Sequence, residues 1–321
     1  MAVARRLQSL NNRVFRRIAR DEIQAGVARL GVVAGDTIFA HVSLRRLGYI
    51  LGGPKEMVEA ILDILGPKGT LVMSAWPAPD PGLADRSRVF DVAETPSACG
   101  LLSEALRKHP KAHRSLHPIA SVVAVGAQAE SLTAGHEETR TPFGPDSPYG
   151  KLAQLTPRLL LVGAHIGGVA YHVQDRVGFP NLYRHEQVEF EVRDQRGRYR
   201  KLATAALRSE VPPVVILPGG RPESRDYLLM PDYAFMFPSE RERRVMEAGY
   251  LRHNRSRFLG RRDRLHARGM LTMGRIGGAE AALLDGARLI EQVAKDLAWD
   301  IARYKEEYDP EQLSCFSLPV L

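Results

Sequence analysis

The amino-acid sequence predicts an α/β protein. Apolar runs of strand length alternate with segments whose apolar residues recur at helical spacing, and this alternation continues from about residue 21 to about residue 168. One succession of strand, helix and strand, within 35–76, is typical of a parallel crossover connection. The 321 residues are 44% hydrophobic and 26% charged, so the chain can build a substantial core in one large domain or two ordinary ones.

Helix and strand boundaries are clearest in the first part of the chain. We expect a helix at 21–30, a strand at 35–44, a helix at 52–66 and a strand at 69–76. Gly31 is a stop signal for the first helix. Pro54 lies near the start of the second helix and Gly66 at its end, which is the usual placement of these two residues.

Further along, the alternation continues and then changes character. We expect a long ordered loop at 77–100, a helix at 101–110, a strand at 120–126, a helix at 127–136, a strand at 158–164, a hairpin at 187–203, a basic helical segment at 239–269 and a long amphipathic helix at 270–308. Proline and small polar residues crowd the loop, and long loops in compact domains are often functional. Arg196 and Gly197 mark the turn of the hairpin.

Positive charge is concentrated in two stretches, 4–20 and 240–269, and the formal net charge is +8. Such stretches could contact nucleic acid or an acidic membrane surface, but a solvated helix face is the favoured interpretation. The second stretch has no helix-turn-helix signature, zinc-finger spacing or regular base-stacking pattern. We therefore expect no nucleic-acid partner, and nucleic-acid binding stays as a disfavoured alternative.

Cysteine usage and hydropathy indicate the compartment. Cys99 and Cys315 lie far apart and form neither a metal pair nor a disulfide framework, which fits a reduced cytoplasm. Residues 1–20 contain no apolar core of signal-peptide length, and no window has the length needed to cross a bilayer. We expect a cytoplasmic protein without a membrane partner.

The ten histidines fall into two groups. Six lie in polar contexts and are expected at the surface: His109, His113, His136, His185, His253 and His266. Four lie near strand ends or before a proline: His41, His117, His165 and His172. Open α/β sheets bind ligands at the carboxyl ends of their strands, so the second group is better placed for function, although a lone histidine is more often structural.

The sequence lacks the motifs of several enzyme and cofactor-binding classes. There is no HExxH motif, and His113 and His117 are not flanked by the carboxylates of a catalytic zinc site, so we expect no metal. GxSxG, the phosphate loop and GxGxxG are absent too, which disfavours covalent, ATP and NAD chemistry. A histidine that removes a proton, with a carboxylate nearby, fits what remains.

Six motifs in order resemble the aminoglycoside 3-N-acetyltransferase family, which acetylates antibiotics with acetyl-CoA. The matching segments are DTIFAHVSLRRLGYILGG, LGPKGTLVMSAW, the run from FDVAETPSACG to RSLHPIAS, FGPDSPYGKLAQLTPRLLLVGA, HVQD and GRIGGAEAALLDGARLI. The resemblance covers nearly the whole chain. It implies a single domain over 1–321, with the basic helical elaboration at about 222–270 inside it.

The resemblance also implies a fold and a chemistry. The fold would be a three-layer α/β/α sandwich around a mixed central sheet, with a small helical and hairpin C-terminal elaboration. Acetyl-CoA would lie in a groove formed by the early loops and donate its acyl group to an amine-bearing acceptor, without a metal. A homodimer is compatible with this expectation.

Residue roles carry over position by position from the resemblance. His172 matches the proposed catalytic histidine, which would deprotonate the attacking amine, and Asp175 matches its companion carboxylate. His41, Ser43 and Leu44 would line the pantetheine end of the coenzyme. The residues that would meet its phosphates or shape the adjacent wall are Arg114, Ser115, His117 and Ser121. For His41 and His117 a packing role is an equal alternative.

The sequence departs from the family pattern at Asp175, where the family has a glutamate. The side chain is one methylene shorter, and catalysis is sensitive to shifts of that size. Nearby Arg176, Arg184 and His185 are basic, whereas a site for polycationic aminoglycosides should be acidic. We therefore expect an acceptor that is less cationic, such as an amino sugar in polysaccharide or natural-product assembly.

Two alternatives to an acetyltransferase stay open. The chain could bind coenzyme A without transferring anything, using 239–269 as an interaction surface. It could also hydrolyse a thioester or amide, with the same histidine activating water.

Overall fold

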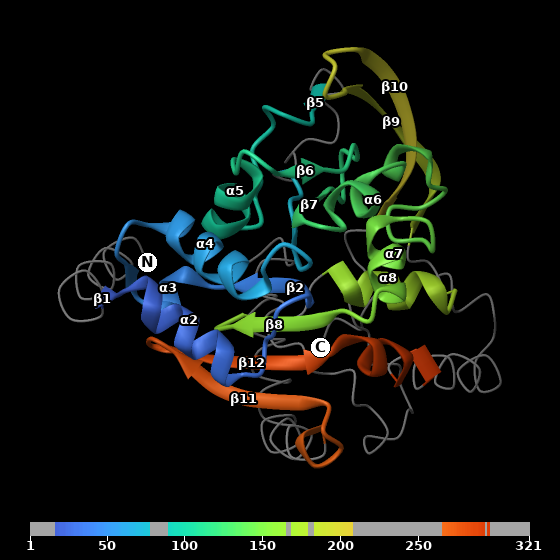
Figure 1. The fold of residues 1–321 in the computed structure, drawn as a ribbon. Coiled ribbons are helices and arrows are strands. Elements are labelled where there is room, and N and C mark those ends of the chain that lie inside the picture. The colour runs from blue at the N-terminus through green and yellow to red at the C-terminus, as the bar shows by residue number, and fades with distance from the viewer. Residues whose placement is uncertain are drawn as a thin grey trace, which may run out of the picture.

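A seven-stranded mixed sheet forms the centre of the molecule (Figure 1). The computed structural model describes residues 17–77, 89–164, 168–178, 183–207, 265–292 and 294–295. The strands of the sheet, in spatial order, are β11 (Leu271–Ile276), β12 (Ala279–Asp285), β8 (Arg158–Val162), β2 (Thr37–Val42), β4 (Thr70–Ser74), β7 (Val122–Gly126) and β6 (His113–Arg114).

The directions of the strands determine where the candidate site lies. β2 is parallel to both of its neighbours, β4 and β8, and the other neighbouring pairs in the sheet are antiparallel. The crossover from β2 to β4 runs through α4 (Pro54–Leu65), as the sequence predicts. Because β2, β4 and β8 point the same way, the chain leaves all three strands at one edge of the sheet.

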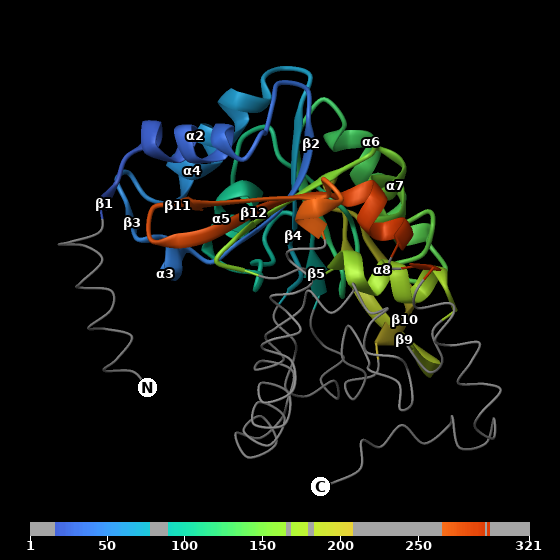
Figure 2. The ribbon, with the colours of Figure 1, turned by 90° about the horizontal axis from the view of Figure 1, so that it is seen from below.

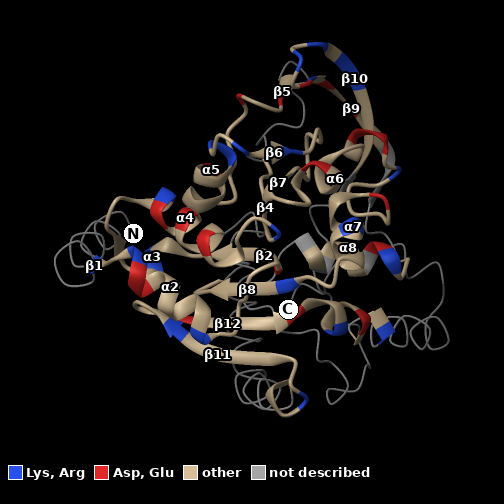
Figure 3. Cartoon of the chain, viewed as in Figure 1, with Lys and Arg blue, Asp and Glu red and all other residues tan. Residues whose placement is uncertain are grey.

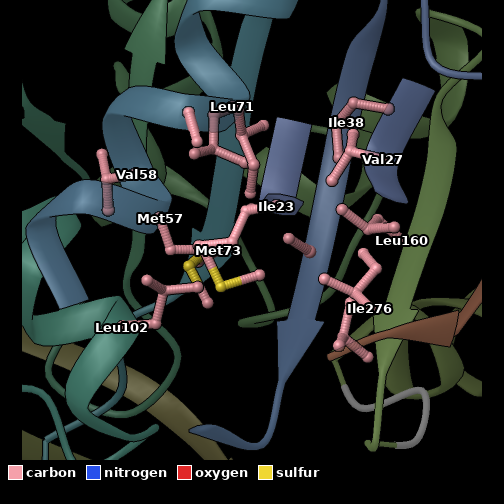
Figure 4. Close-up of a cluster of buried hydrophobic side chains, with 14 of the residues drawn as sticks. Ile23, Val27, Ile38, Met57, Val58, Leu71, Met73, Leu102, Leu160 and Ile276 are labelled. Atoms are coloured by element: carbon pink, nitrogen blue, oxygen red, sulfur yellow. The ribbon is translucent and has the colours of Figure 1, made fainter. Parts of the chain in front are cut away.

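One face of the sheet is covered by three helices. These are α2 (Arg20–Arg29), α4 and α5 (Leu101–Arg107), which share a buried apolar cluster with alternate residues of the strands. Figure 4 shows this cluster with its labelled side chains Ile23, Val27, Ile38, Met57, Val58, Leu71, Met73, Leu102, Leu160 and Ile276.

The opposite face is covered by α6 (Ala129–Thr133), α7 (Pro148–Gln154), α8 (Gly168–Arg176) and the helical residues 286–292. Phe39, Val72 and Leu159, which alternate with the strand residues of the first cluster, are buried here. Arg176 of α8 donates to Glu291 at 2.9 Å, so α8 lies beside the last described helix (Figure 2). The predicted α/β fold with a mixed central sheet is confirmed.

A second sheet carries the predicted hairpin. Its order is β10 (Tyr199–Leu207), β9 (Tyr183–Arg193) and β5 (Val89–Asp91), and β9 and β10 are antiparallel around the expected turn. Gly197 occupies the left-handed region there, with φ of 76°. Two positive charges on this hairpin have acidic partners: Arg200 contacts Glu137 at 2.6 Å and Lys201 contacts Glu189 at 2.9 Å. Figure 3 shows basic and acidic residues interspersed across the described elements.

Near the N-terminal end of the described chain, two short strands and a four-residue helix pack beside the sheet. β1 (Arg17–Ile18) is parallel to β3 (Tyr49–Ile50), and α3 (Leu44–Leu47) follows β2. β5 lies within the segment expected as a loop; 78–88 of that segment lie outside the described residues.

The expectation of one long helix over 270–308 is wrong for residues 271–285. Residues 271–285 form the β11–β12 hairpin, which extends the sheet from β8, and the described helical residues begin at 286. Gly277 and Gly278 form the two-residue turn, and a Cβ on Gly277 would lie 2.8 Å from the Leu47 carbonyl oxygen. Residues 281–284 of β12 are apolar and buried on both faces of the sheet, so their pattern resembles that of a buried helix, whereas Thr272 and Arg275 of β11 are exposed.

Other expectations concern residues outside the described ranges. Residues 208–264 and those beyond 295 are among them, so the basic helical segment and the end of the last helix stay predictions, as does the single-domain organisation. Within the described part of the chain, no helix is both long and apolar enough to cross a membrane.

Candidate active site

The candidate site lies at the edge where β2, β4 and β8 end. His41 pairs in register with Leu161, so the segments that follow β2 and β8 leave the sheet side by side. α8 follows β8 and carries His172, while Trp76 follows β4 two residues after its end. Residues far apart in sequence therefore meet at this edge.

His172 is buried, with 4% of its surface exposed, and its ring is oriented by the backbone. Nδ1 lies 2.8 Å from the carbonyl oxygen of Phe143. A carbonyl oxygen only accepts, so Nδ1 carries the hydrogen and Nε2 of the neutral ring has a lone pair. The interaction selects the tautomer that a general base at Nε2 requires.

Burial also sets the charge of this ring. It lowers the pKa of His172 below the usual value, and the Phe143 carbonyl and the Asp175 carboxylate act in the opposite direction. His172 is therefore neutral at pH 7 and able to accept a proton. Asp175 is half-buried one helical turn further on; a Cβ on Gly144 would lie 3.7 Å from its Oδ1.

Four aromatic side chains form a wall around Phe143, the residue whose carbonyl accepts from His172. Phe143 is central: its ring centroid lies 5.0 Å from those of both Tyr149 and Tyr171 and 5.7 Å from that of Trp76. Trp76 donates from Nε1 to the Tyr149 hydroxyl at 2.6 Å, and that hydroxyl also contacts Ser74 Oγ at 3.2 Å. Burial of the His172 imidazole strengthens the electrostatic interactions around it.

The three residues predicted to line the pantetheine end lie together at the end of β2. The His41 ring meets Phe39 edge to face at 4.9 Å. Ser43 donates its backbone N–H to the Val162 carbonyl at 2.8 Å, and the half-buried Leu44 packs against the apolar cluster below. Their role in coenzyme binding stays a prediction.

Arg114 is buried, with 6% exposure, and its guanidinium donates to backbone carbonyls. The distances are 2.6 Å to Ala75 and 2.5 Å to Thr95, and Nε donates to Ser121 Oγ at 3.2 Å. Burial lowers the pKa of Arg114 to about 10. These contacts attach the segment around Thr95 to the end of β4; the predicted contact with coenzyme phosphates stays a prediction.

Ser115 and His117 are buried beside an unexpected partner, His136. The expectation that His136 lies at the surface is wrong: its exposed fraction is 0%. Ser115 Oγ lies 2.8 Å from His136 Nδ1, and the rings of His117 and His136 stack at 4.3 Å. Polar sequence neighbours hide this burial, because η1 (His136–Glu138) presents its two glutamates and its histidine in different directions.

The remaining histidines divide as follows. His266 is exposed, as expected, whereas His109 and His113 are half-buried. His165, His253 and the side chain of His185 lie outside what the structure describes. In the described part of the chain, no group of three or more His, Cys, Asp or Glu residues could hold a metal ion.

Comparison with known families decides the relationship. Residues 39–298 match the family model described as aminoglycoside 3-N-acetyltransferase. The chain belongs to this family. Its fold agrees with the assignment: the crystal structure of aminoglycoside acetyltransferase AAC(3)-Xa superposes with a TM-score of 0.65 at 25% identity, covering 94% of this chain and 100% of that one. AAC-IIIb in its binary complex with CoASH gives 0.64 at 25% identity, covering 88% and 96%.

Relatives in the family are more similar over shorter stretches. Aminoglycoside N(3)-acetyltransferase VIII of Streptomyces fradiae is 33% identical over 189 residues, or 51% of this chain and 63% of that protein. Aminoglycoside N(3)-acetyltransferase VII of Streptomyces paromomycinus is 37% identical over 162 residues, or 46% and 56%. The aligned part of the chain thus spans less than two thirds of each relative.

Sequence reasoning missed the aromatic wall and His136 in this member of the family. Trp76 is the last residue of the strand predicted at 69–76, and this place at a strand end is a usable signal. Tyr149 and Phe143 lie in a segment without such a signal, more than 60 residues from Trp76. Their association depends on contacts across the sheet.

Proposed function

We propose that the chain is an acetyl-CoA-dependent N-acetyltransferase that acetylates an amino group of an aminoglycoside or a related amino sugar. The observation that carries the proposal is the orientation of His172: its Nδ1–H is held by the Phe143 carbonyl, which leaves Nε2 of a neutral ring able to accept a proton. Family membership supplies the acyl donor and the acceptor class.

The reaction follows from these groups. The amine nitrogen attacks the thioester carbonyl carbon while Nε2 of His172 takes the amine proton. The C–S bond then breaks, the amide forms, and the imidazolium returns the proton to the departing sulfur, which leaves as coenzyme A thiol. No acyl-enzyme intermediate is required. Asp175 stabilises the transient imidazolium by its charge.

The residues at and after the end of β2 suit the chemical groups of coenzyme A. The end of β2 offers the apolar surface of Leu44 beside the polar His41 and Ser43, which suits pantetheine. Arg45 and Arg46 are exposed on α3, immediately after these residues, and guanidinium groups suit phosphates. We assign the donor to this side and the acceptor to the side of Asp175.

A thiol-release assay on His172 variants tests the proposal. We expect His172→Ala to lower kcat by about 10²–10⁴-fold, with acetyl-CoA binding by calorimetry unchanged within a few-fold. The matched control is His266→Ala, an exposed histidine, which should keep the wild-type rate. Wild-type turnover in His172→Ala would remove this residue from the mechanism.

The same assay separates the alternatives. Thiol release without any amine would indicate a hydrolase, and coenzyme binding without release would indicate a non-catalytic relative. The acceptor is tested with a panel that compares polycationic aminoglycosides with singly charged amino sugars. High turnover of kanamycin or gentamicin would refute the expectation of a less cationic acceptor.

A further inference from the structure

Consecutive carbonyl groups connect His172 to a second buried histidine. The carbonyl oxygen of Phe143 accepts from Nδ1 of His172 at 2.8 Å. The carbonyl oxygen of the preceding residue, Pro142, lies 2.9 Å from Nε2 of His136. One two-residue stretch of backbone therefore contacts both rings.

Hydrogen-bond partners determine the tautomer of His136. Pro142 offers only an acceptor, so Nε2 carries the hydrogen and Nδ1 accepts. The donor to Nδ1 is the Ser115 hydroxyl at 2.8 Å, whose oxygen in turn accepts from the backbone N–H of Val122 at 2.9 Å. Every polar atom of the ring has one partner of the required type.

The His117 ring packs against one face of the His136 ring. Its Nδ1 accepts from the backbone N–H groups of Ile119 and Ala120, both at 3.2 Å, so Nε2 donates to Thr204 Oγ1 at 3.1 Å. The two rings stack with an interplanar angle of 27°. Both are fully buried, and this burial lowers the pKa of each.

The backbone that follows Phe143 is held as well. The Gly144 N–H donates to the Thr141 carbonyl at 3.3 Å, and the Gly144 carbonyl accepts from Ser147 Oγ at 2.6 Å. The hydrogen bond from His136 is made to Pro142, the residue immediately before Phe143, whose carbonyl accepts from His172. The Pro142 and Phe143 carbonyls belong to consecutive peptide planes that share the Cα of Phe143, so a displacement of the first plane shifts the start of the plane that presents the Phe143 oxygen.

We propose that His136 is a positioning residue for His172: its Nε2–H holds the Pro142 carbonyl so that the Phe143 carbonyl selects the Nδ1–H tautomer of His172. The inference rests on the proposed function for its kinetic consequence. The tautomer itself is a property of the resting protein.

A matched pair of substitutions tests this role. His136→Gln places an amide nitrogen near the position of Nε2 and keeps the donor to Pro142. His136→Asn places its amide near Nδ1, where it reaches Ser115 but leaves Pro142 without a donor. We expect His136→Asn to lower kcat on the order of 10²-fold at unchanged KM for acetyl-CoA, and His136→Gln to retain most of kcat.

Nitrogen-15 NMR of histidine side chains supplies a readout that needs no turnover. Wild type and His136→Gln should show His172 protonated at Nδ1, and His136→Asn should show a mixture of tautomers. Leu106→Ala, in the apolar cluster on the other face of the sheet, controls for lost stability and should leave tautomer and kcat unchanged. An unchanged His172 tautomer and kcat in folded His136→Asn would overturn the inference.

A second variant covers the case in which His136→Asn does not fold. Ser115→Ala removes the donor to Nδ1 of His136, so its proton can move there and part of the population loses the bond to Pro142. We expect a smaller drop in kcat with a partial change of the His172 tautomer; no change in either contradicts the inference. Absence of acetyl transfer in wild type would instead defeat the proposed function and leave the tautomer result standing.

Discussion

A histidine ring acquires its chemistry from the atoms that face its two nitrogens. His172 meets one carbonyl at Nδ1, so Nε2 is left as the base. His136 meets a carbonyl at Nε2 and a hydroxyl at Nδ1, and both of its nitrogens serve structure. The residue type is the same, but the sequence neighbours do not reveal these partners. His172 was predicted from its place after a strand and from the family resemblance, whereas His136 was missed because the partners of its ring come from two other parts of the chain, 115–117 and Pro142.

The Tyr149 hydroxyl is a second group whose role depends on its partners. We predict that Tyr149→Phe lowers the free energy of unfolding by about 1–3 kcal/mol, because the half-buried Trp76 Nε1–H and the buried Ser74 hydroxyl lose their shared partner. Urea denaturation measures the loss. Tyr199→Phe, at an exposed tyrosine, is the control and should be neutral. Equal stability of both variants would contradict the assigned hydrogen bonds.

At the scale of elements, α7 illustrates how a helix is adapted to the site. It begins after the N-cap Ser147, whose Oγ accepts from the Gly150 N–H at 3.3 Å and donates to the Gly144 carbonyl. Gly150 lies against the Pro145 carbonyl oxygen, which a Cβ would approach to 2.1 Å. The helix therefore packs closely on the backbone that follows Phe143, and glycine is required within its first turn.

Gly150→Ala should reverse the usual effect of this substitution in a helix. Propensity alone would stabilise the protein by about 1 kcal/mol, but the contact with backbone cannot relax cheaply, so we predict destabilisation by about 1–3 kcal/mol. Ala153→Gly in the same helix measures the ordinary propensity cost. Thermal or urea unfolding measures the sign of the stability change. A Gly150→Ala variant more stable than wild type would show that the Pro145 carbonyl does not lie this close to Gly150.

The β11–β12 hairpin shows where local pattern misleads at this scale. Leu283 and Leu284 are both buried, one on each face of the sheet, so no polar alternation marks the strand. In contrast, α4 was predicted well because proline and glycine mark its two ends. Element type is predictable where such residues are present, and ambiguous where a strand is covered on both faces.

At the scale of the whole molecule, buried neutral histidines couple folding to pH. Burial lowers the pKa of His117 and His172 and brings that of His136 to about 3, whereas unfolded histidines titrate near ~6.5. Below that pH the unfolded state binds more protons than the folded state. Their contribution to stability is complete above pH ~6.5 and is lost progressively as the pH falls.

We predict that the urea midpoint decreases when the pH is lowered from 7 to 5. The free energy of unfolding plotted against pH has a slope in this range, and we expect His136→Gln to reduce that slope by up to about 1.4 kcal/mol per pH unit. His266→Asn, at an exposed position, should leave the slope unchanged. Glu104 does not interfere, because Arg107 lowers its pKa to about 2 and its contribution is lost only below the pH range tested. A slope that His136→Gln does not change would show that His136 titrates normally in the folded protein.

Local sequence patterns were sufficient for the alternation of strands and helices, the parallel crossover through α4, the β9–β10 hairpin and the placement of His172 after a strand. Each of these depends on residues within a few positions of one another, where side-chain periodicity and backbone preferences act. The β11–β12 strands, the aromatic wall around Phe143, the burial of His136 and the tautomer of His172 depended on contacts between segments distant in the chain. Burial and hydrogen-bond partners are properties of the folded arrangement, and they determine which nitrogen of an imidazole is free to accept a proton.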